Sequence, residues 1–598
     1  MLPRAAATEP RTRKKGSDPA VKPWNYVMFA IIGVAFVIAI CVRYHDTGEL
    51  PAPPAQAAPE LRSDGTWTTW VRNRWLKLLP PQRLLPSTQP TYVRTWIYSF
   101  GALMLAALFW IVVSGVILTF KGQEWYHVTQ QGRFVRTTHA WGVQLFFVFM
   151  AVHFLGVWAG SAWRGGRRFI WLTGMLAFLA SVGEAFTGFL AQGNFDSQWI
   201  ASEGKDGLNA IGVGAQFNAL NYGQMLLLHI APVALLLFAL IAAHVLLVRR
   251  CPACSDQNRP RRAACSFRDG RGGIGMRTAR RTRTDPDMEW TGPERRFDLV
   301  KEFVVATIVV GIVIVALSFA FRVPDEPAVT FKSWASANAT DFVTTAVAEL
   351  NGSSTTAGYG RPYNNTPGAA QKLGPISLQS AAGVSIPVDT AEDFVLTPLS
   401  TVAGDPQLAK ALATYRTASA DQQASWSKSY GDALAAAPDN DPAKVAPGDY
   451  GPVPVLAAKL LALASSGALD GALASGTDNT KAQLFIADGG FLADQGDAQQ
   501  LGGDHWGMVN SSGSFPGQFW LTGFSFWYQV DPFKSSSNGD ALAFGALGIL
   551  TLVVIFLPWI PGLRSVPRLL RLHRLIWWPF YRKQRNDAAP RMGAVARK

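Results

Sequence analysis

Two apolar stretches that begin and end in histidine decide the fold. The first is His139–His153, HAWGVQLFFVFMAVH, and the second is His229–His244, HIAPVALLLFALIAAH. Neither contains Asp, Glu, Lys or Arg. Each lies in an apolar run long enough to cross the roughly 30 Å of bilayer hydrocarbon as a helix. Because an imidazole in hydrocarbon is costly and usually marks function, these four histidines are the first candidate functional residues.

The spacing of these histidines predicts two sites at different depths. His139 and His153 are 14 residues apart, and His229 and His244 are 15 apart. At about 100° per residue, 14 steps return to within roughly 40° of the start and 15 steps overshoot by roughly 60°. Each pair therefore lies near one helix face, about 21 Å apart along the axis. If the two helices are antiparallel neighbours, their histidines face each other at two depths in the membrane. His139 then faces His229, and His153 faces His244.

Two stacked bis-imidazole sites fit two iron porphyrins, because imidazole is a common axial ligand of haem iron. The simpler alternative is four unrelated histidines bonded to backbone carbonyls, which matched pairs make less expected. A zinc site is disfavoured, because each level supplies only two His and no nearby Cys or carboxylate. The sequence therefore predicts two haems.

Four glycines repeat the same interval. Gly101 and Gly115 are 14 residues apart, and so are Gly174 and Gly188. A residue without a side chain lets a planar cofactor approach the helix backbone, although small residues also pack membrane helices together. Arg136, just before the first stretch, is a candidate partner for a haem propionate. An ordinary interfacial arginine is the alternative.

The composition is that of a membrane protein. Of 598 residues, 49% are hydrophobic and only 16% are charged, against about 25% charged in soluble proteins. The net charge of +14 is expected from basic cytoplasmic loops rather than from nucleic-acid binding. Four cysteines are too few for a disulfide scaffold.

The apolar runs predict an all-α integral membrane protein, because a backbone in hydrocarbon must satisfy its hydrogen bonds internally. We expect a four-helix dihaem bundle with additional membrane helices and an inserted, mostly helical or irregular, extracytoplasmic domain. The runs, of which the first is slightly short, are Tyr26–Cys41, Ile97–Phe120, His139–Trp163, Phe169–Ala191, Gly223–Val248, Phe303–Phe321 and Ala541–Ile560.

Charge in the connecting segments predicts the orientation. Residues 249–298 contain 13 Arg, and residues 561–598 contain ten Lys or Arg and one Asp, so both are expected in the cytoplasm. Residues 322–539 contain 11 Lys or Arg and 20 Asp or Glu, which favours a soluble extracytoplasmic domain. The first run conflicts with this scheme, because its basic flank would lie outside. It is therefore left open as an interfacial helix or a processed leader.

These features divide the chain into six parts. They are an N-terminal tail with the first apolar helix (1–61), the dihaem four-helix bundle (62–248), an Arg-rich cytoplasmic loop (249–298), a fifth helix (299–321), the soluble insertion (322–539), and a sixth helix with a basic tail (540–598). In the insertion, the Ala-rich stretch Pro454–Leu473 predicts helix. In the tail, Arg568–Arg585 predicts one amphipathic interfacial helix.

The cysteines give weaker signals. Cys251-Pro-Ala-Cys254, with Cys265, has the spacing of a zinc or redox site. Because no fourth ligand is evident, reduced thiols or a lipidated cysteine are the preferred interpretation. The insertion contains no Cys-x-x-Cys-His, so a covalently attached c-type haem is not expected there.

Several of these residues resemble the cytochrome b and cytochrome b6 family, the dihaem subunit of quinol–cytochrome c and plastoquinol–plastocyanin oxidoreductases. The likeness covers about Val71–Val248, and more weakly Arg296–Phe321 and Gly517–Tyr581. The motifs that carry it are RTTHAW at 136–141, HFLGVW at 153–158, NYGQMLLLH at 221–229 and the paired glycines.

The resemblance implies a role for each histidine. His139 and His229 would bind the outer, low-potential haem. His153 and His244 would bind the inner, high-potential haem.

The resemblance also implies a cytoplasmic quinone-reducing site. The segment FDLVKE at 297–302 is similar to the start of the family's fifth helix, which contributes to that site. Lys301 and Glu302 are therefore candidates to deliver protons there. An interfacial anchor pair is the alternative.

The family's outer quinol-oxidising motifs are incomplete here. After the third helix, Thr187-Gly188 remains, but the Pro-Trp of Gly-Tyr-x-Leu-Pro-Trp is absent. Residues 525–528, SFWY, keep the Trp-Tyr of Pro-Glu-Trp-Tyr and lack the carboxylate that takes a proton from quinol in the family. Glu184 is a candidate replacement, since an apolar pocket suits a carboxyl to accept a proton. A bonded carboxyl with a packing role is the alternative, and Asp196 is expected to be a solvated loop residue.

The sequence thus predicts a dihaem b-type cytochrome subunit of a respiratory or photosynthetic electron-transfer complex in a prokaryotic cell membrane. Quinol or quinone, other subunits of the complex, a Rieske-type iron–sulfur protein or cytochrome c, and a second copy of the chain are the candidate partners. One alternative is a haem conduit that passes electrons from a partner docked on residues 322–539 to quinone near Lys301. The other is a non-catalytic membrane scaffold.

Overall fold

A computed structural model describes most of the chain. The described residues are 95–164, 167–250, 294–359, 371–384, 388–499, 501 and 519–578, with the short pieces 30, 34, 37, 49–50, 67, 69–70, 73–74, 88–90, 254–255, 288–289 and 582. They divide into two compact units. Unit 1 contains Glu184–Ala234 and Pro324–Ile549, and unit 2 contains Arg4–Gly183, Leu235–Val323 and Leu550–Lys598.

Six of the predicted membrane segments are confirmed as helices long and apolar enough to span a bilayer. They are Trp96–Val128, Gln130–Ala159, Arg168–Leu190, Tyr222–Arg249, Leu299–Ala320 and Gly539–Trp559. The chain is thus an all-α, multi-pass membrane protein. Its described strands are only two or three residues long: β1 Glu49–Leu50, β2 Thr88–Pro90, β3 Cys254–Ser255, β4 Met288–Glu289 and β5 Glu294–Arg296. The seventh run, Tyr26–Cys41, lies almost entirely outside the described residues.

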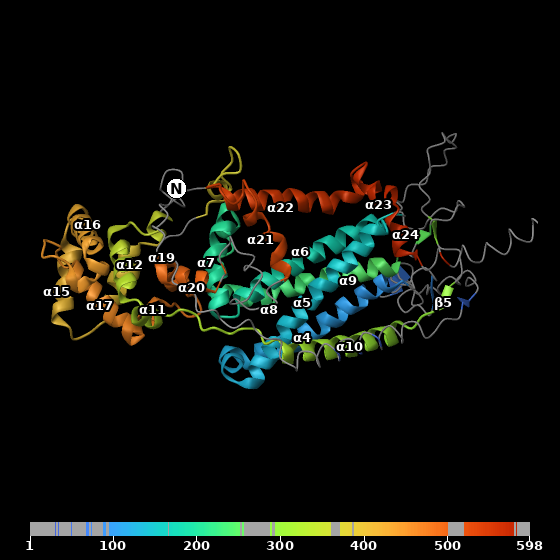
Figure 1. Cartoon of the computed structure of the whole chain (residues 1–598), viewed down its shortest axis with the longest axis horizontal. Coiled ribbons are helices and arrows are strands. Elements are labelled where there is room, and N and C mark those ends of the chain that lie inside the picture. Colours follow the sequence, from blue (N-terminus) through green and yellow to red (C-terminus); the bar gives the residue numbers. More distant parts are fainter. Residues whose placement is uncertain are drawn as a thin grey trace, which may run out of the picture. The chain divides into compact units, whose positions relative to one another are not determined.

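The membrane helices carry the labels shown in Figure 1. They are α4 Phe100–Val128 with η2 Trp96–Ser99 before it, α5 Gln130–Ala159, α6 Arg168–Leu190, α8 Tyr222–Ile230, α9 Pro232–Arg250, α10 Leu299–Ala320 and α22 Gly539–Phe556. Short side chains begin three of them. Thr129, Asn221 and Asp298 each accept a hydrogen bond from a backbone N–H of the first turn, which satisfies donors that have no partner inside the helix.

In unit 2, α10 packs along α4 and α5 (Figure 1). The indole Nε1 of Trp110 in α4 donates to the carbonyl of Thr307 at 2.9 Å. The indole of Trp141 in α5 donates to the carbonyl of Phe321, also at 2.9 Å. A Cβ at Gly311 would lie 2.7 Å from the Trp110 ring. The absence of a side chain at Gly311 therefore lets α10 lie close to α4, as small residues do between membrane helices.

The predicted span Gly223–Val248 is two helices. Ala231 has φ −131° and ψ −84°, so α8 ends at Ile230 and α9 begins at Pro232. Proline has no N–H to continue the helical ladder, and its ring clashes with the carbonyl four residues earlier. The break lies between His229 and His244, so the angle calculated for a continuous helix does not apply to this pair.

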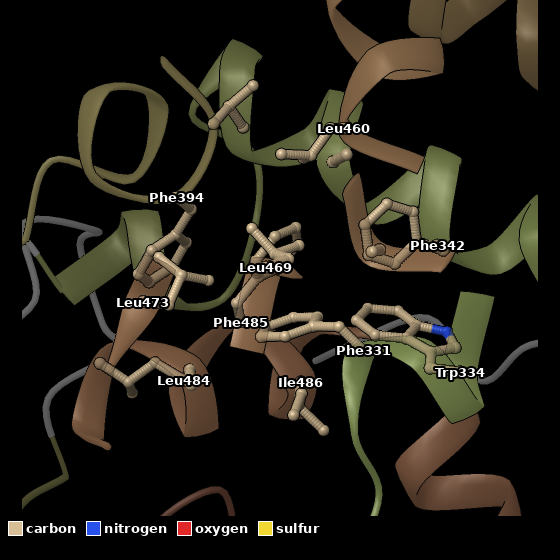
Figure 2. Packing of buried hydrophobic residues seen from close by; sticks show 14 of the residues in the cluster. Phe331, Trp334, Phe342, Phe394, Leu460, Leu469, Leu473, Leu484, Phe485 and Ile486 are labelled. Carbon is tan, nitrogen blue, oxygen red and sulfur yellow. The ribbon is translucent and has the colours of Figure 1, made fainter. Parts of the chain in front are cut away.

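Unit 1 is built mainly from short helices around an aromatic core. Phe331, Trp334, Phe342, Phe394 and Phe485 are all fully buried within it. Figure 2 shows these side chains converging from several short helices, of which one carries both Phe331 and Trp334. The rings of Phe394 and Phe485 stack with their centroids 5.3 Å apart. The same core includes Phe195 and Trp199, so unit 1 has one hydrophobic interior to which both of its chain segments contribute.

The helices of unit 1 have the following bounds. They are α7 Phe195–Ala210, η3 Val213–Ala215, α11 Phe331–Ala337, α12 Ala339–Asn351, η4 Thr356–Tyr359, α13 Leu378–Ala382, η5 Ala391–Leu396, α14 Thr397–Ser400, α15 Pro406–Thr417, α16 Ala420–Ala436, η6 Pro438–Asn440, η7 Pro442–Lys444, α17 Val453–Ser466, α18 Ala468–Leu473, α19 Thr480–Asp488, α20 Gly490–Ala498, η9 Phe519–Leu521, α21 Thr522–Ser525 and η10 Trp527–Gln529. The helix predicted over Pro454–Leu473 is confirmed, with a break at Gly467.

The connection between α6 and α8 joins the core of the insertion. The side-chain amide of Gln198 in α7 accepts from the N–H of Val329 at 2.7 Å and donates to its carbonyl at 3.0 Å. The indole of Trp199 donates to the carbonyl of Leu501 at 3.0 Å. The expectation for Asp196 was wrong, because this residue lies in the first turn of α7 and is only 2% exposed.

The tail does not form the single amphipathic helix predicted for Arg568–Arg585. The described residues form η11 Leu557–Trp559, η12 Leu563–Ser565, α23 Val566–Leu569 and α24 Leu572–Ile576. Arg571 has φ +54°, a left-handed conformation that interrupts a right-handed helix. The indole of Trp577 donates to the hydroxyl of Tyr98 at 2.9 Å, which ties this end of the chain to η2.

Candidate functional site

His139 lies against α4. Its Nδ1 is 3.1 Å from the carbonyl oxygen of Ile111 and 3.0 Å from the hydroxyl of Ser114. That hydroxyl donates to the carbonyl of Trp110 at 2.7 Å, so its oxygen accepts from the imidazole. A Cβ at Gly115 would lie 3.2 Å from Cε1 of the ring. The neighbouring helix thus holds the ring of His139 through Nδ1.

His244 repeats this arrangement between α9 and α6. Its Nδ1 is 3.0 Å from the carbonyl oxygen of Ile170 and 3.3 Å from the hydroxyl oxygen of Thr173. A Cβ at Gly174 would lie 3.0 Å from its Cε1.

His229 repeats it again between α8 and the last turns of α6, with one difference. Its Nδ1 is 3.0 Å from the carbonyl oxygen of Glu184 and 3.1 Å from the carboxylate Oε1 of the same residue. A Cβ at Gly188 would lie 2.5 Å from Cε1 of His229, which a real side chain could not tolerate. The second acceptor here is a carboxylate rather than a hydroxyl.

His153 faces the remaining glycine. A Cβ at Gly101 would lie 3.6 Å from both Cε1 and Nδ1 of its ring, an ordinary contact distance. Each predicted histidine therefore lies against one predicted glycine. The contact explains the shared interval of 14 residues by ring-to-backbone packing; approach of a porphyrin to these glycines stays a prediction.

Three of the four sites share one rule. The histidine Nδ1 meets the carbonyl four residues before the glycine: Ile111 before Gly115, Ile170 before Gly174 and Glu184 before Gly188. In a helix that carbonyl already accepts from the glycine N–H. The absence of a Cβ opens the approach by which the imidazole reaches the same oxygen.

These contacts decide which ring nitrogen can bind a metal. A carbonyl oxygen can only accept, so Nδ1 of His139, His229 and His244 carries the proton. In a neutral imidazole the lone pair is then on Nε2, the nitrogen that a metal would take. A backbone partner at the other nitrogen is the usual arrangement of a metal-binding histidine. The residues present therefore fit axial ligation of haem iron.

Arg136 is almost fully buried in α5, with 5% of its surface exposed. Its Nη2 donates to the carbonyl of Val323 at 3.3 Å, just beyond the end of α10. It therefore fixes a helix end, and its pairing with a propionate stays a prediction.

Lys301 and Glu302 lie in the first turn of α10. Lys301 is exposed and Glu302 is partly buried. Glu302 interacts electrostatically with Arg249 at the end of α9. Their role in proton delivery stays a prediction.

The structure reveals a carboxylate beside the retained Trp-Tyr pair that the sequence analysis missed. The hydroxyl of Tyr528 donates to Oδ1 of Asp540 at 2.5 Å. Gln371 donates to Oδ2 of Asp540 at 2.7 Å. Burial, and then the charge of Asp540, raises the pKa of the Tyr528 hydroxyl, so the phenol stays protonated and donates. Asp540 follows the motif by only 12 residues, so its proximity was a usable signal.

The cysteine prediction falls mostly outside the described residues. Cys251 and Cys265 are not described, and Cys254 lies in β3, which pairs with β4. Within the part of the chain that the structure describes, no three His, Cys, Asp or Glu side chains come together to hold a metal ion.

Comparison with known proteins gives three informative similarities, although no family model matches the chain. The chain is 26% identical over 178 residues to the menaquinol:cytochrome c reductase cytochrome b subunit of Bacillus subtilis, covering 26% of this chain and 80% of that protein. It is 24% identical over 182 residues to cytochrome b6 of Heliobacterium modesticaldum, covering 27% and 85%. It is 23% identical over 206 residues to the cytochrome bc complex cytochrome b subunit of Chlorobaculum thiosulfatiphilum, covering 30% and 47%.

Proposed function

Because the chain is related to the cytochrome b and b6 family, we propose that it is a dihaem b-type cytochrome. It would move electrons across the membrane as a subunit of a quinol-linked electron-transfer complex. The observation that carries this proposal is the orientation of His139, His229 and His244 by backbone carbonyls at Nδ1. That orientation supports Nε2 as the atom that would bind the iron.

The spacing of the histidines supports two haems rather than one. His139 with His229 would hold one haem, and His153 with His244 the other. Each bound haem would supply an iron centre that gains and loses one electron. The chain's own residues would hold the rings at fixed angles and surround them with apolar side chains, and Arg136 would pair with a propionate.

The relatives' names support quinol as the reductant. Menaquinol:cytochrome c reductase is the name of the Bacillus subtilis protein. On this chain, Lys301 and Glu302 are the candidates for proton delivery at a quinone-reducing site. Glu184 remains a candidate catalytic residue of the quinol-oxidising site, and Tyr528 with Asp540 adds a carboxylate that the SFWY motif itself lacks.

A second candidate function is the haem conduit, which would take electrons from a docked partner and lack a quinol-oxidising site. The loss of the Pro-Trp and Glu positions from the two outer motifs favours it. Quinol-driven haem reduction by the purified chain that an inhibitor acting at the outer face blocks would exclude it. Sensitivity to quinone-site inhibitors at a single face would support it.

A Rieske-type iron–sulfur protein, cytochrome c and a second copy of the chain remain the proposed partners. The proposed location is a prokaryotic cell membrane, with residues 322–539 outside the cytoplasm. Protease added to spheroplasts should cleave within residues 322–539 and leave the loop at 249–298 intact; the reverse pattern would contradict the proposed orientation.

Haem content tests the proposed function directly. The purified wild-type chain should contain two b haems, measured by a reduced-minus-oxidised spectrum and a pyridine haemochrome assay. His139→Ala and His153→Ala should each lose one haem, because each removes one axial ligand. His127→Ala, a histidine outside the four, is the matched control and should retain both. Unchanged haem content in both ligand variants would remove the assignment.

A further inference from the structure

Glu184 differs from its counterparts at the other histidines. The residue whose carbonyl accepts from Nδ1 is Ile111 for His139 and Ile170 for His244. At His229 it is Glu184, which offers both its carbonyl, at 3.0 Å, and its carboxylate Oε1, at 3.1 Å. Both acceptors therefore converge on a single N–H of one proposed ligand.

The pair lies in surroundings that strengthen the interaction. The side chains of His229 and Glu184 are 22% and 18% exposed. The second carboxylate oxygen, Oε2, is buried and has no hydrogen-bond partner among the described residues. Since little water reaches the pair, the hydrogen bond between the carboxyl and the imidazole is little screened, and so is the charge of the carboxylate when it is ionised.

A carboxylate in this position changes the electronics of an axial ligand. A metal-bound histidine that donates its other N–H to a carboxylate becomes a more basic ligand. Both the more basic imidazole and the nearby negative charge stabilise ferric iron, which carries one more positive charge than ferrous iron. The hydroxyls of Ser114 and Thr173 carry no charge and cannot have this effect on His139 or His244.

We propose that Glu184, with its carboxylate ionised, is a positioning residue that lowers the midpoint potential of the haem bound through His229. The inference rests on the proposed function, because it requires His229 to be an axial ligand. It assigns a specific cause to a difference between the two haems: one carboxyl side chain in α6.

A redox titration of Glu184→Gln tests the proposal. Glutamine keeps an oxygen that accepts from Nδ1 and removes the charge. In the full-length chain in detergent, the midpoint potential of one haem should rise by about 59 mV. For one electron this is about a tenfold change in the equilibrium constant of its reduction. The other midpoint should not move. The spectrum of His229→Ala identifies the affected haem, because that variant lacks it.

Glu184→Ile reproduces the residue found at the two equivalent positions and should raise the same midpoint at least as far. Ser114→Ala and Thr173→Val are matched controls that remove an uncharged acceptor beside His139 and His244. Neither should reproduce the rise. If Glu184→Ile fails to fold, Glu184→Gln alone still decides.

The outcomes separate this inference from the proposed function. Two haems with unchanged midpoints in Glu184→Gln would overturn the role of Glu184 and leave the dihaem assignment standing. Loss of a haem in Glu184→Gln would also overturn it, because the carboxyl would then hold the ligand in place rather than tune it. A wild-type chain without haem would overturn the proposed function itself.

Discussion

The two ends of α6 use the same backbone rule and differ in one chemical group. Near Gly174, the carbonyl of Ile170 and the hydroxyl of Thr173 receive Nδ1 of His244. Near Gly188, the carbonyl and the carboxylate of Glu184 receive Nδ1 of His229. The repeated backbone contact explains how one helix can orient two histidines. The difference in charge shows how the same scaffold can give them different properties.

The two ends also differ in how tightly they are packed. A Cβ would lie 2.5 Å from the ring of His229 at Gly188 and 3.0 Å from the ring of His244 at Gly174. The Gly188 end therefore tolerates less added volume. Substitutions that add volume should therefore have larger effects at Gly188 than at Gly174. Substitutions that remove charge should likewise have their larger effect at this end, because Glu184 lies there.

The largest expected effect concerns which group takes the quinol proton. Asp540 belongs to unit 1, with Gly188 and His229, whereas Glu302 belongs to unit 2, with Gly174 and His244. If quinol is oxidised beside Tyr528, Asp540→Asn should slow quinol-driven haem reduction about 100-fold, as loss of a proton acceptor does. Stopped-flow absorbance at the haem α band measures this rate.

Reduction by dithionite, which needs no proton acceptor, is the control for Asp540→Asn and should be unchanged. Glu302→Gln is the matched variant from the other unit. If Glu302→Gln slows quinol-driven reduction and Asp540→Asn does not, quinol is oxidised at the other site and the haem-conduit alternative gains support.

Adding one methyl group at the glycines should give the next largest effect. Gly188→Ala places a carbon where the ring of His229 lies, and overpacking of this kind costs about 1–3 kcal/mol. We expect one haem to be lost or weakly held. Gly101→Ala should be nearly neutral, because a Cβ there would lie 3.6 Å from the ring of His153.

Haem retention during heating, followed by the Soret band, ranks these glycine variants. The expected order of damage is Gly188, Gly174, Gly115 and then Gly101, which follows the contact distances. Equal damage at Gly188 and Gly101 would contradict the view that these glycines make room for the rings.

Much of this comparison could be predicted from the sequence. Hydropathy predicted seven apolar runs, and six of them are membrane-length helices in the described part of the chain, because the length and polarity of a span are local properties. The intervals of 14 and 15 residues between histidines, and of 14 between glycines, selected the same residues that the structure brings into contact. Proline at 232 was also a readable signal for the break before α9.

The remainder depends on tertiary contacts that no local pattern encodes. Asp196 has the polarity of a loop residue, yet α7 buries it because Gln198 and Trp199 attach this helix to Val329 and Leu501. The acceptors of each Nδ1 could not be inferred either, since they depend on the register between two helices. The contact between Glu184 and His229 is of this kind.

Moving the carboxylate to the other end of α6 should give an intermediate effect. Ile170→Glu places a carboxyl at the position equivalent to Glu184, beside Nδ1 of His244. The midpoint potential of the haem bound through His244 should fall by about 59 mV, which is about a tenfold change in the equilibrium constant of its reduction. Ile170→Gln, which adds the same volume without charge, separates charge from packing. A fall of equal size in both variants would show that packing, not charge, sets the potential.

The smallest expected effect concerns Thr173. Its hydroxyl is 3.3 Å from Nδ1 of His244, while the carbonyl of Ile170 is closer, at 3.0 Å. Thr173→Val removes the weaker of two shared acceptors and keeps the shape, so the imidazole retains its main partner. Since a whole neutral hydrogen bond contributes only about 0.5–1.5 kcal/mol, we expect the midpoint to move by no more than about twofold in the equilibrium constant. A shift as large as that of Glu184→Gln, in the same titration, would mean that loss of any second acceptor raises the midpoint potential. The number of hydrogen bonds to Nδ1, rather than charge, would then distinguish the two ends of α6.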